Sequence, residues 1–348
     1  VRWVTHTRTE STHTMTDDFW DGFAGRTDAA TFQRHPTSGA PYVNHPTKRT
    51  LKGLPSRVQY GRPSSAYAQI DQRFNLEKWS QREVLVGAIT MLMTGEILPD
   101  DLGIISEFNR DDADHKKALD RLCVMAKERS GSMIAAEHGT HHHLTTEDGD
   151  NEVDIIGRLR AGERLGVSAA VTEAVLRAWD RLINEYDLEI LSVEQPVVDD
   201  DFNLAGTLDR VARLGRDLTF QTDDGPVTIP AGTVIVLDLK TGKLTVDSND
   251  RPRYWHGYAV QVASYAKSRP YDVNTEERTR WARRPSRKHA LIAHLLVSDD
   301  RVEARLIYVN LRAGISALQI IKRAKAYAKR NDVFSHAGPA LVTEPVAS

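Results

Sequence analysis

The residue types best suited to chemistry lie at the end of an apolar run, Val234 to Lys243, which reads VIVLDLKTGK. On a strand, side chains alternate between the two faces, so Asp238 and Lys240 point the same way, while Leu237 and Leu239 pack on the other side. An acid and an amine therefore emerge together where a buried strand ends. A buried carboxylate without a partner is costly, so we expect a metal ion or another cation to meet Asp238. The alternative is a surface ion pair at a strand end.

Two further motifs carry polar groups on regular elements. A second probable strand contains Asp209 and Arg210, which follow Thr207 and Leu208. Downstream, a helical segment places Gln261 four residues before a tyrosine, so both side chains share one face of that helix. These groups add a carboxylate, a guanidinium and two hydrogen-bonding heads to the chemistry of the first motif.

Three consecutive histidines, His141, His142 and His143, lie upstream of these strands. Consecutive residues on a helix point in directions about 100° apart, so at most two of the three could reach one ion. The alternative to a metal role is a polar, partly solvated helix start with Thr140 as its N-cap.

In this order, the four motifs resemble those of the RecB-type exonuclease family of the PD-(D/E)XK nuclease superfamily. The family pattern is G-T-x-x-H, then G-x-x-D-R, then D-x-K-T-G, then Q-x-x-x-Y. The chain matches it at Gly139, Thr140 and His143, at Gly206, Asp209 and Arg210, at Asp238, Lys240, Thr241 and Gly242, and at Gln261 and Tyr265. The resemblance covers about residues 118 to 310, and each motif alone is a weak signal.

The resemblance implies an α/β fold with a restriction-endonuclease-like core, in which helices flank a mixed central sheet, preceded here by an N-terminal helical extension. It implies metal-dependent hydrolysis of DNA phosphodiester bonds, most often by an exonuclease, in phage or bacterial DNA recombination or repair. DNA is then the main partner, with a recombination or helicase protein as a further one. Two alternatives stay open: an endonuclease on the same core, and a DNA-binding protein without catalysis.

The resemblance also implies roles for single residues. Around the first metal we expect His143, Asp209, Asp238 and the carbonyl of Leu239. A glutamate of the first strand approaches the metal in the family, and the interior acid of the strand Leu188 to Val198 is Glu194, which could help to hold a second ion. The alternative for this glutamate is an exposed position on an edge strand.

This ligand set is rich in oxygen and suits one or two Mg²⁺ or Mn²⁺ ions rather than a structural Zn²⁺. Lys240 would orient the attacking water or neutralise the charge that grows on the phosphorane, and it completes a catalytic group with Asp238, Asp209 and Glu194. The residues expected on the substrate side are Gln261, Tyr265 and Arg210.

Composition narrows the partners and cofactors. The net charge of the 348 residues is −2, so any contact with DNA must come from local basic patches. The single cysteine, Cys123, excludes a disulfide framework and a cysteine-ligated iron–sulfur cluster. Because the phosphate-binding G-x-x-x-x-G-K-[ST] motif is absent from the sequence, we expect no ATP.

One basic patch stands out between residues 276 and 289, where arginines surround Trp281. Basic residues interleaved with an aromatic ring suit a phosphate backbone with a base stacked beside it, although a charge run is also typical of a solvated loop. We expect DNA contact from Arg280, Arg283 and Arg284. The lysine-rich helix predicted near the C-terminus, from Ala313 to Arg330, offers another DNA path.

The organisation follows from hydrophobic periodicity. Residues 1–75 read as an N-terminal arm, partly extended or disordered, and 76–113 as a helical extension; residues 114–335 form the expected nuclease domain, and 336–348 a flexible tail. Helices are expected at 115–138 and within 151–186, and a hairpin within 219–233. The longest apolar run, residues 84–93, is too short to cross a bilayer, so we expect no membrane contact and a cytoplasmic protein.

Overall fold

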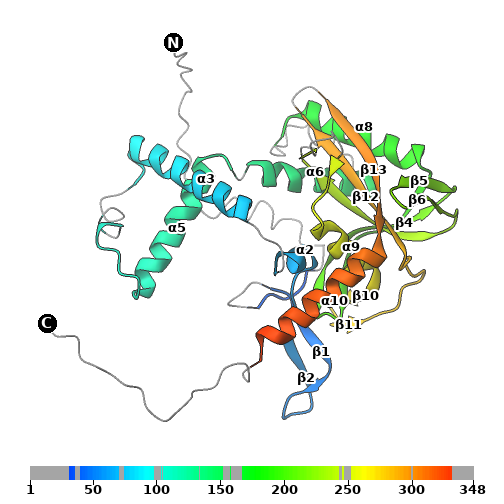
Figure 1. The fold of residues 1–348 in the computed structure, drawn as a ribbon, viewed down its shortest axis with the longest axis horizontal. Coiled ribbons are helices and arrows are strands. Elements are labelled where there is room, and N and C mark those ends of the chain that lie inside the picture. Colours follow the sequence, from blue (N-terminus) through cyan, green and yellow to red (C-terminus); the bar gives the residue numbers. More distant parts are fainter. Residues whose placement is uncertain are drawn as a thin grey trace.

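The structure, a computed structural model, describes residues 31–35, 40–69, 74–97, 103, 105–132, 134–151, 157, 167–242, 245–246, 252–298 and 301–330. The expected tail and the first thirty residues of the expected arm lie outside these ranges. The described residues include a central sheet with helices on both faces and two helices that stand to one side of it (Figure 1).

A mixed sheet of seven strands forms the centre of the structure, in the order β11-β10-β3-β4-β7-β12-β13. Strands β7 and β12 run parallel, and the other neighbours are antiparallel. The α/β class with a mixed central sheet is therefore confirmed. The strands are β3 (Leu188–Asp199), β4 (Leu204–Leu214), β7 (Val234–Thr241), β10 (Arg269–Asp272), β11 (Glu277–Arg278), β12 (His289–Val297) and β13 (Val302–Asn310).

Two hydrophobic layers cover the two faces of this sheet. On one face, α9 (Gly257–Lys267) and α10 (Leu311–Ala328) pack on a core that includes Val234 and Val236. On the other, α8 (Ala169–Glu185) packs on a core that includes Leu237. The alternation predicted for β7 is confirmed, and the strand is buried on both faces until its last two residues.

The long helix predicted at 115–138 is instead two helices, α5 (Ala113–Arg129) and α6 (Ile134–Asp150). Gly131, with φ of 77°, lies in the turn between them, in the left-handed region that ends helices. The three histidines therefore lie inside α6, and the alternative of a helix start capped by Thr140 is wrong. Of the helix expected within 151–186, the described part is α8, which Ser168 caps through a hydrogen bond from the Val171 N–H.

Part of the expected arm is folded. Strands β1 (Tyr42–Arg49) and β2 (Pro55–Gln59) form an antiparallel hairpin, which is followed by the short helix α2 (Pro63–Ala66) and the 3-10 turn η1 (Tyr67–Gln69). A few large side chains hold this folded part of the arm against the sheet. Phe32, for example, stacks on Tyr271 of β10 with ring centroids 5.3 Å apart. These large side chains do not recur at a helical or strand spacing, so the composition of the segment alone did not predict that it folds.

The other elements are peripheral to the sheet. The hairpin expected within 219–233 is present as β5 (Leu218–Thr222) and β6 (Gly225–Ile229), and β8 (Thr245–Val246) pairs with β9 (Pro252–Arg253). The expected helical extension contains α3 (Phe74–Met93), which packs against α5. Among the described residues, no helix is both long enough and apolar enough to span a bilayer.

Candidate metal centre

The acid and the amine of the central motif meet at the end of β7. Asp238 is fully buried, and its Oδ2 lies 2.5 Å from Nζ of Lys240. Its Oδ1 accepts a hydrogen bond of 3.2 Å from Nε2 of Gln261 on α9. Burial raises the pKa of Asp238 to about 7, against the opposing effect of the Lys240 ammonium. The buried Asp238 carboxylate is therefore held by one cation, Lys240, and by one amide, Gln261.

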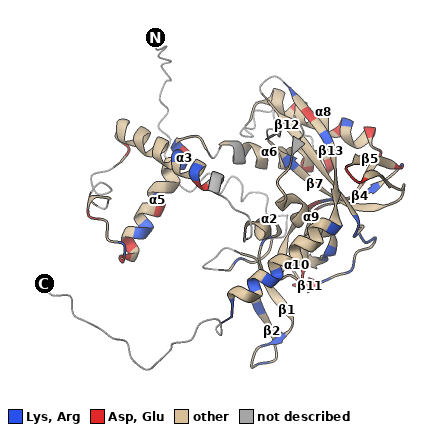
Figure 2. Cartoon of the chain, viewed as in Figure 1, with Lys and Arg blue, Asp and Glu red and all other residues tan. Residues whose placement is uncertain are grey.

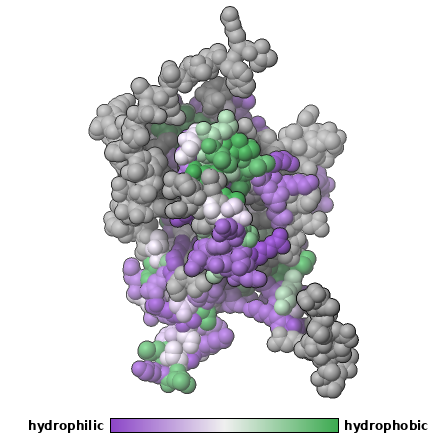
Figure 3. All heavy atoms as spheres, turned by 90° about the vertical axis from the view of Figure 1, so that its left-hand side faces the viewer, coloured by the Kyte–Doolittle hydropathy of each residue, from purple (hydrophilic) through white to green (hydrophobic). Residues whose placement is uncertain are grey.

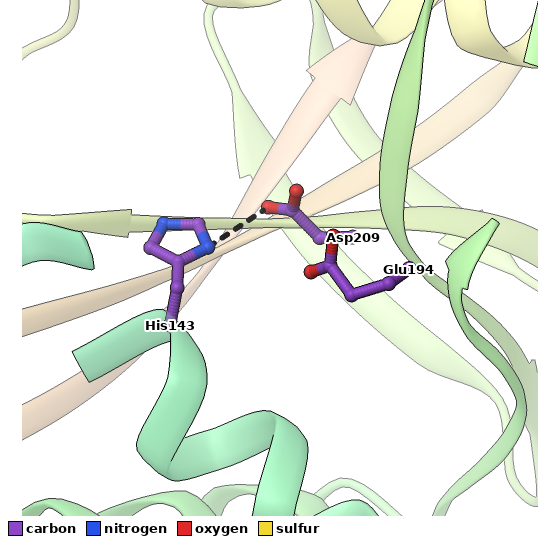
Figure 4. A group of neighbouring side chains, drawn as sticks. All are labelled: His143, Glu194 and Asp209. Atoms are coloured by element: carbon purple, nitrogen blue, oxygen red, sulfur yellow. Dashed lines mark ion pairs between the residues drawn. The ribbon is translucent and has the colours of Figure 1, made fainter. Parts of the chain in front are cut away.

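Three potential metal ligands converge beside this pair. His143 from α6, Glu194 from β3 and Asp209 from β4 each offer one ligand atom, and these atoms lie within 4.8 Å of one another (Figure 4). Nδ1 of His143 is 3.7 Å from Oδ2 of Asp209. The same carboxylate oxygen accepts a 2.7 Å hydrogen bond from the Leu239 N–H, which ties the group to β7.

A close contact between helix and strand brings His143 to this place. A Cβ added at Gly139 would lie 3.0 Å from Oγ1 of Thr241, so a larger residue would require the neighbouring atoms to give by a few tenths of an ångström. His143 follows one turn later on the same helix face. The glycine and the threonine that the family pattern contains at these positions therefore act together in packing.

The backbone of Glu194 is strained. Its φ is 47°, in the left-handed region that non-glycine residues rarely adopt within a strand. Pairing continues on both sides, with Val193 opposite Arg210 and Gln195 opposite Leu208. Such a conformation costs on the order of 1–3 kcal/mol and is found most often at functional sites. The strain is an independent indication that the position of this glutamate matters.

The surroundings of these ligands favour a cation. Burial, followed by the negative charge of Asp209, raises the pKa of Glu194 to about 8. Burial lowers the pKa of His143, although the Asp209 carboxylate and a backbone hydrogen bond with Leu239 oppose this effect. A neutral imidazole is the form that binds metals, and the Glu194 carboxyl, which resists ionisation, would gain from a divalent cation.

Arg210 has a different place from the one expected on the substrate side. Its side chain is fully buried; Nε donates to Oδ2 of Asp150 at 2.8 Å, and Nη2 donates to Oγ1 of Thr146 at 3.1 Å. Nη1 lies 3.4 Å from Oε1 of Glu194, and the guanidinium stacks over Trp179, 5.4 Å from the ring centroid. Arg210 thus faces the protein interior, where it positions α6, β3 and α8 relative to one another.

Gln261 and Tyr265 do share one face of α9, as their spacing predicted. Both are buried, and Nε2 of Gln261 lies 3.3 Å from the Tyr265 hydroxyl. Tyr265 belongs to the core between α9 and the sheet, and burial raises its pKa well above the ordinary value. The structure therefore places this pair behind Asp238, which Gln261 orients.

The basic segment contains side chains of two kinds. Arg278 pairs with Asp200 at 2.7 Å, and Nε1 of Trp281 donates to the Ser268 carbonyl at 2.9 Å. The tryptophan also packs against the core and is partly buried, so only part of its ring is open to a base. The residues expected to contact DNA are exposed: Arg280, Arg283 and Arg284.

The basic segment is attached to the sheet at two separate places. The Ser286 N–H donates to the carbonyl of Val234, the first residue of β7. Asp238 comes four residues later, about 13 Å along the strand. The Thr279 N–H donates to the carbonyl of Pro270 on β10, so the segment that contains Arg280, Arg283 and Arg284 runs from β10 to the start of β7.

The ligand group differs from the expected one in one member. His143 and Asp209 come together as predicted, but Glu194 completes the group, while Asp238 turns to Lys240. Sequence reasoning did not identify Asp150, although it shares a helix face with His143, seven residues earlier. That spacing was the available signal for a second acidic group on α6.

The fold and the site together define an α/β protein with a candidate divalent-metal centre of one imidazole and two carboxylates. No family profile matches this chain, and no curated protein matches it either.

Proposed function

We propose that this chain is a metal-dependent deoxyribonuclease built on a PD-(D/E)XK core and related to the RecB-type exonucleases. One observation carries the proposal: the group of His143, Glu194 and Asp209 and the pair of Asp238 and Lys240 share the end of one strand, β7. The four sequence motifs meet at this strand end. A metal site beside a buried ammonium suits a reaction in which negative charge grows on a phosphate.

The donor set fits Mg²⁺ or Mn²⁺. Imidazole and carboxylate ligands suit these ions, and the raised pKa of Glu194 reflects a place where negative charge is poorly compensated. His143, Glu194 and Asp209 would hold the ion, and Asp238 and the Leu239 carbonyl would be further oxygen donors at this strand end. When bound, such an ion polarises the scissile phosphate and lowers the pKa of a neighbouring water.

Lys240 supplies the charge that the protein itself brings to the reaction. Its ammonium lies 2.5 Å from Asp238 Oδ2 and 3.3 Å from the Leu239 carbonyl, which hold it at the site in one orientation. From there Nζ orients the attacking water or donates to a phosphate oxygen as the phosphorane forms. Gln261 fixes Asp238 from behind, and Asp238 in turn holds the Lys240 ammonium in place.

Exonucleolytic cleavage of DNA, in phage or bacterial recombination or repair, is the activity we propose. A helicase or recombination protein would deliver the substrate, since the sequence carries no phosphate-loop motif. An endonuclease on the same core and a DNA-binding protein without catalysis are the competing functions.

Closed circular and linear duplex DNA, incubated with the protein and Mg²⁺, separate these functions. An exonuclease consumes only the linear form, an endonuclease opens the circle, and a binding protein cuts neither. Asp238→Asn should abolish cutting. Asp223→Asn, in the exposed turn between β5 and β6, serves as the matched control and should retain it. Cutting that persists in chelator or in Asp238→Asn would contradict the proposal.

A further inference from the structure

A hollow of about 240 Å³ lies between helix α10 and the turn that joins β3 to β4. Its apolar lining includes Leu204, Leu318 and Ile321, which belong to the core beneath α10. Val236 of β7 is part of the same core, and Asp238 follows it on the same face of the strand. The hollow therefore lies on the face of the sheet to which Asp238 turns.

Three lysines of α10 also line this hollow: Lys322, Lys325 and Lys329. Their spacing of three and four residues places them within an arc of about 60° on one helix face. Within the part of the chain that the structure describes, none of the three is paired with a carboxylate. Asp201 lines the hollow too, but its Oδ2 lies 3.2 Å from Nζ of Lys267, which compensates its charge.

The position of Lys325 makes this uncompensated charge unfavourable. A Cβ added at Gly61 would lie 3.8 Å from Nζ of Lys325, so the ammonium is held against the backbone of the opposite wall. Burial, followed by the charge of Lys329, lowers the pKa of Lys325. Like charges three and four residues apart also destabilise a helix. In a chain with a net charge of −2, such a group of cations at a hollow favours an anion as the ligand.

The wall opposite α10 is built from hydrogen-bonded backbone. The Gly61 N–H donates to the Asn203 carbonyl at 2.8 Å, and the Ala205 N–H donates to the Gly61 carbonyl at 2.9 Å. The ring of Phe202 lies beside this wall, with Nζ of Lys322 5.5 Å from its centroid. The shape of the hollow is thus fixed before any ligand binds.

The end of α10 that carries these lysines is at the surface, and Lys322 and Lys329 are exposed. Basic residues gather toward this end of the helix (Figure 2). Figure 3 views the molecule from the side toward which this end points, and the described surface in its lower half is largely hydrophilic. A large ligand can therefore reach the lysines from solvent.

We propose that this hollow holds phosphate groups of a DNA strand that also reaches the metal centre, an inference that rests on the function proposed above. Lys329 follows Lys322 by seven residues, so the lysines form a row about 10 Å long. A row of that length suits a backbone with several phosphates better than a single phosphate ion. Asp209 follows Leu204 by five residues, about 17 Å along β4, which corresponds to about five nucleotides of a duplex strand.

Salt titrations of DNA binding test the lysine row. We would change its three lysines to Gln and measure the binding of labelled linear duplex DNA by fluorescence anisotropy, in Ca²⁺ to suppress cutting. The slope of log affinity against log salt concentration should be smaller by about 0.9 for each lost phosphate contact. Changing the same three lysines to Arg keeps their charge and should keep the slope. Circular dichroism checks that each variant is folded.

The matched control removes the same number of charges from exposed lysines elsewhere in the chain and should keep a slope close to that of wild type: Lys48→Gln, Lys52→Gln and Lys116→Gln. Equal slopes for the two triple Gln variants would show that the row is a solvated helix face and would overturn the proposal.

Single-turnover cleavage separates this proposal from the function on which it rests. At saturating DNA the Gln variant of the row should cut at the wild-type rate, because its lysines position the strand away from the reacting phosphate. Half-maximal rate should require more DNA. If wild type cuts DNA but the slope does not depend on the row, only the present proposal fails. If the slope depends on the row but wild type does not cut, only the nuclease function fails.

Calorimetric titration with thymidine monophosphate distinguishes a free nucleotide from a DNA strand. A single phosphate meets only part of the row, so the mononucleotide should bind wild type at least about 100-fold more weakly than duplex DNA does. Binding as tight as that of DNA, and lost in the Gln variant of the row, would assign the hollow to free nucleotides and overturn the proposal.

Discussion

The buried guanidinium of Arg210 provides a quantitative test of how the site is held together. We consider Arg210→Met, which keeps an unbranched chain but removes the charge and the donors. The change leaves Asp150, with 6% of its side chain exposed, without its cation, and it removes the 3.4 Å contact between Nη1 and Glu194. It also removes the stack on Trp179, whose Nε1 donates to the same Asp150 at 2.8 Å.

Breaking a buried ion pair by removing one partner costs about 3–5 kcal/mol, chiefly because the remaining charge stays buried. We therefore expect Arg210→Met to lower the free energy of unfolding by that amount at neutral pH.

Urea unfolding of the metal-free protein, followed by circular dichroism, measures this loss. Arg213→Met is the matched control, three residues along the same strand, because Arg213 pairs with Glu189 at a surface where both side chains are at least 36% exposed. A surface pair contributes at most about 1 kcal/mol. If the two variants lost equal stability, Arg210 would not position the site as described.

Three further predictions concern the ligands and the DNA path. His143→Ala should lower the cleavage rate by at least about 10²-fold in a single-turnover assay. His142 is a buried neighbour outside the ligand group, so His142→Ala should lower stability but reduce activity much less. The reverse order of activities would mean that the motif is misplaced. Because the pKa of Glu194 is raised from 4.5 to about 8, its neutral carboxyl favours the folded state, and metal-free wild type should lose stability as the pH rises through that interval. In Glu194→Gln the melting temperature should depend less on pH across the same interval. An unchanged dependence would show that Glu194 is not its cause. The third variant changes Arg280, Arg283 and Arg284 to Ala. In salt titrations of DNA binding in Ca²⁺, its slope of log affinity against log salt concentration should be smaller by about 0.7–0.9 per lost phosphate contact. An identical slope would indicate that DNA binds elsewhere, for example at the lysines of α10 (Figure 2).

The sequence predicted those parts of the fold that depend on a local period. The alternation of β7 placed Asp238 and Lys240 on one face, and the four-residue spacing on α9 placed Gln261 beside Tyr265; both arrangements are present. Such patterns are set by backbone geometry, which is the same in every strand and helix. These patterns can therefore be predicted without knowing which residues pack against the element.

Features that depend on tertiary contacts could not be predicted in this way. A residue next to Asp209 was expected to face the substrate, but Arg210 points inward because Asp150 and Trp179, 60 and 31 residues earlier, provide its partners. Likewise, Trp281 looked available in an arginine-rich segment, yet the Ser268 carbonyl binds its indole N–H. The separation in sequence between each of these side chains and its partner follows no rule, so sequence alone could not identify the partner.

Cleavage and binding measured on the same variant test the central claim most directly. Asp209→Asn keeps the shape of the side chain that meets His143, Glu194 and the Leu239 N–H, but removes its charge. With linear duplex DNA and Mg²⁺, wild type should cut, and Asp209→Asn should cut at least about 10²-fold more slowly while its DNA affinity in Ca²⁺ stays within a few-fold. Wild-type cleavage by Asp209→Asn, or no cleavage by wild type with either Mg²⁺ or Mn²⁺, would contradict the account.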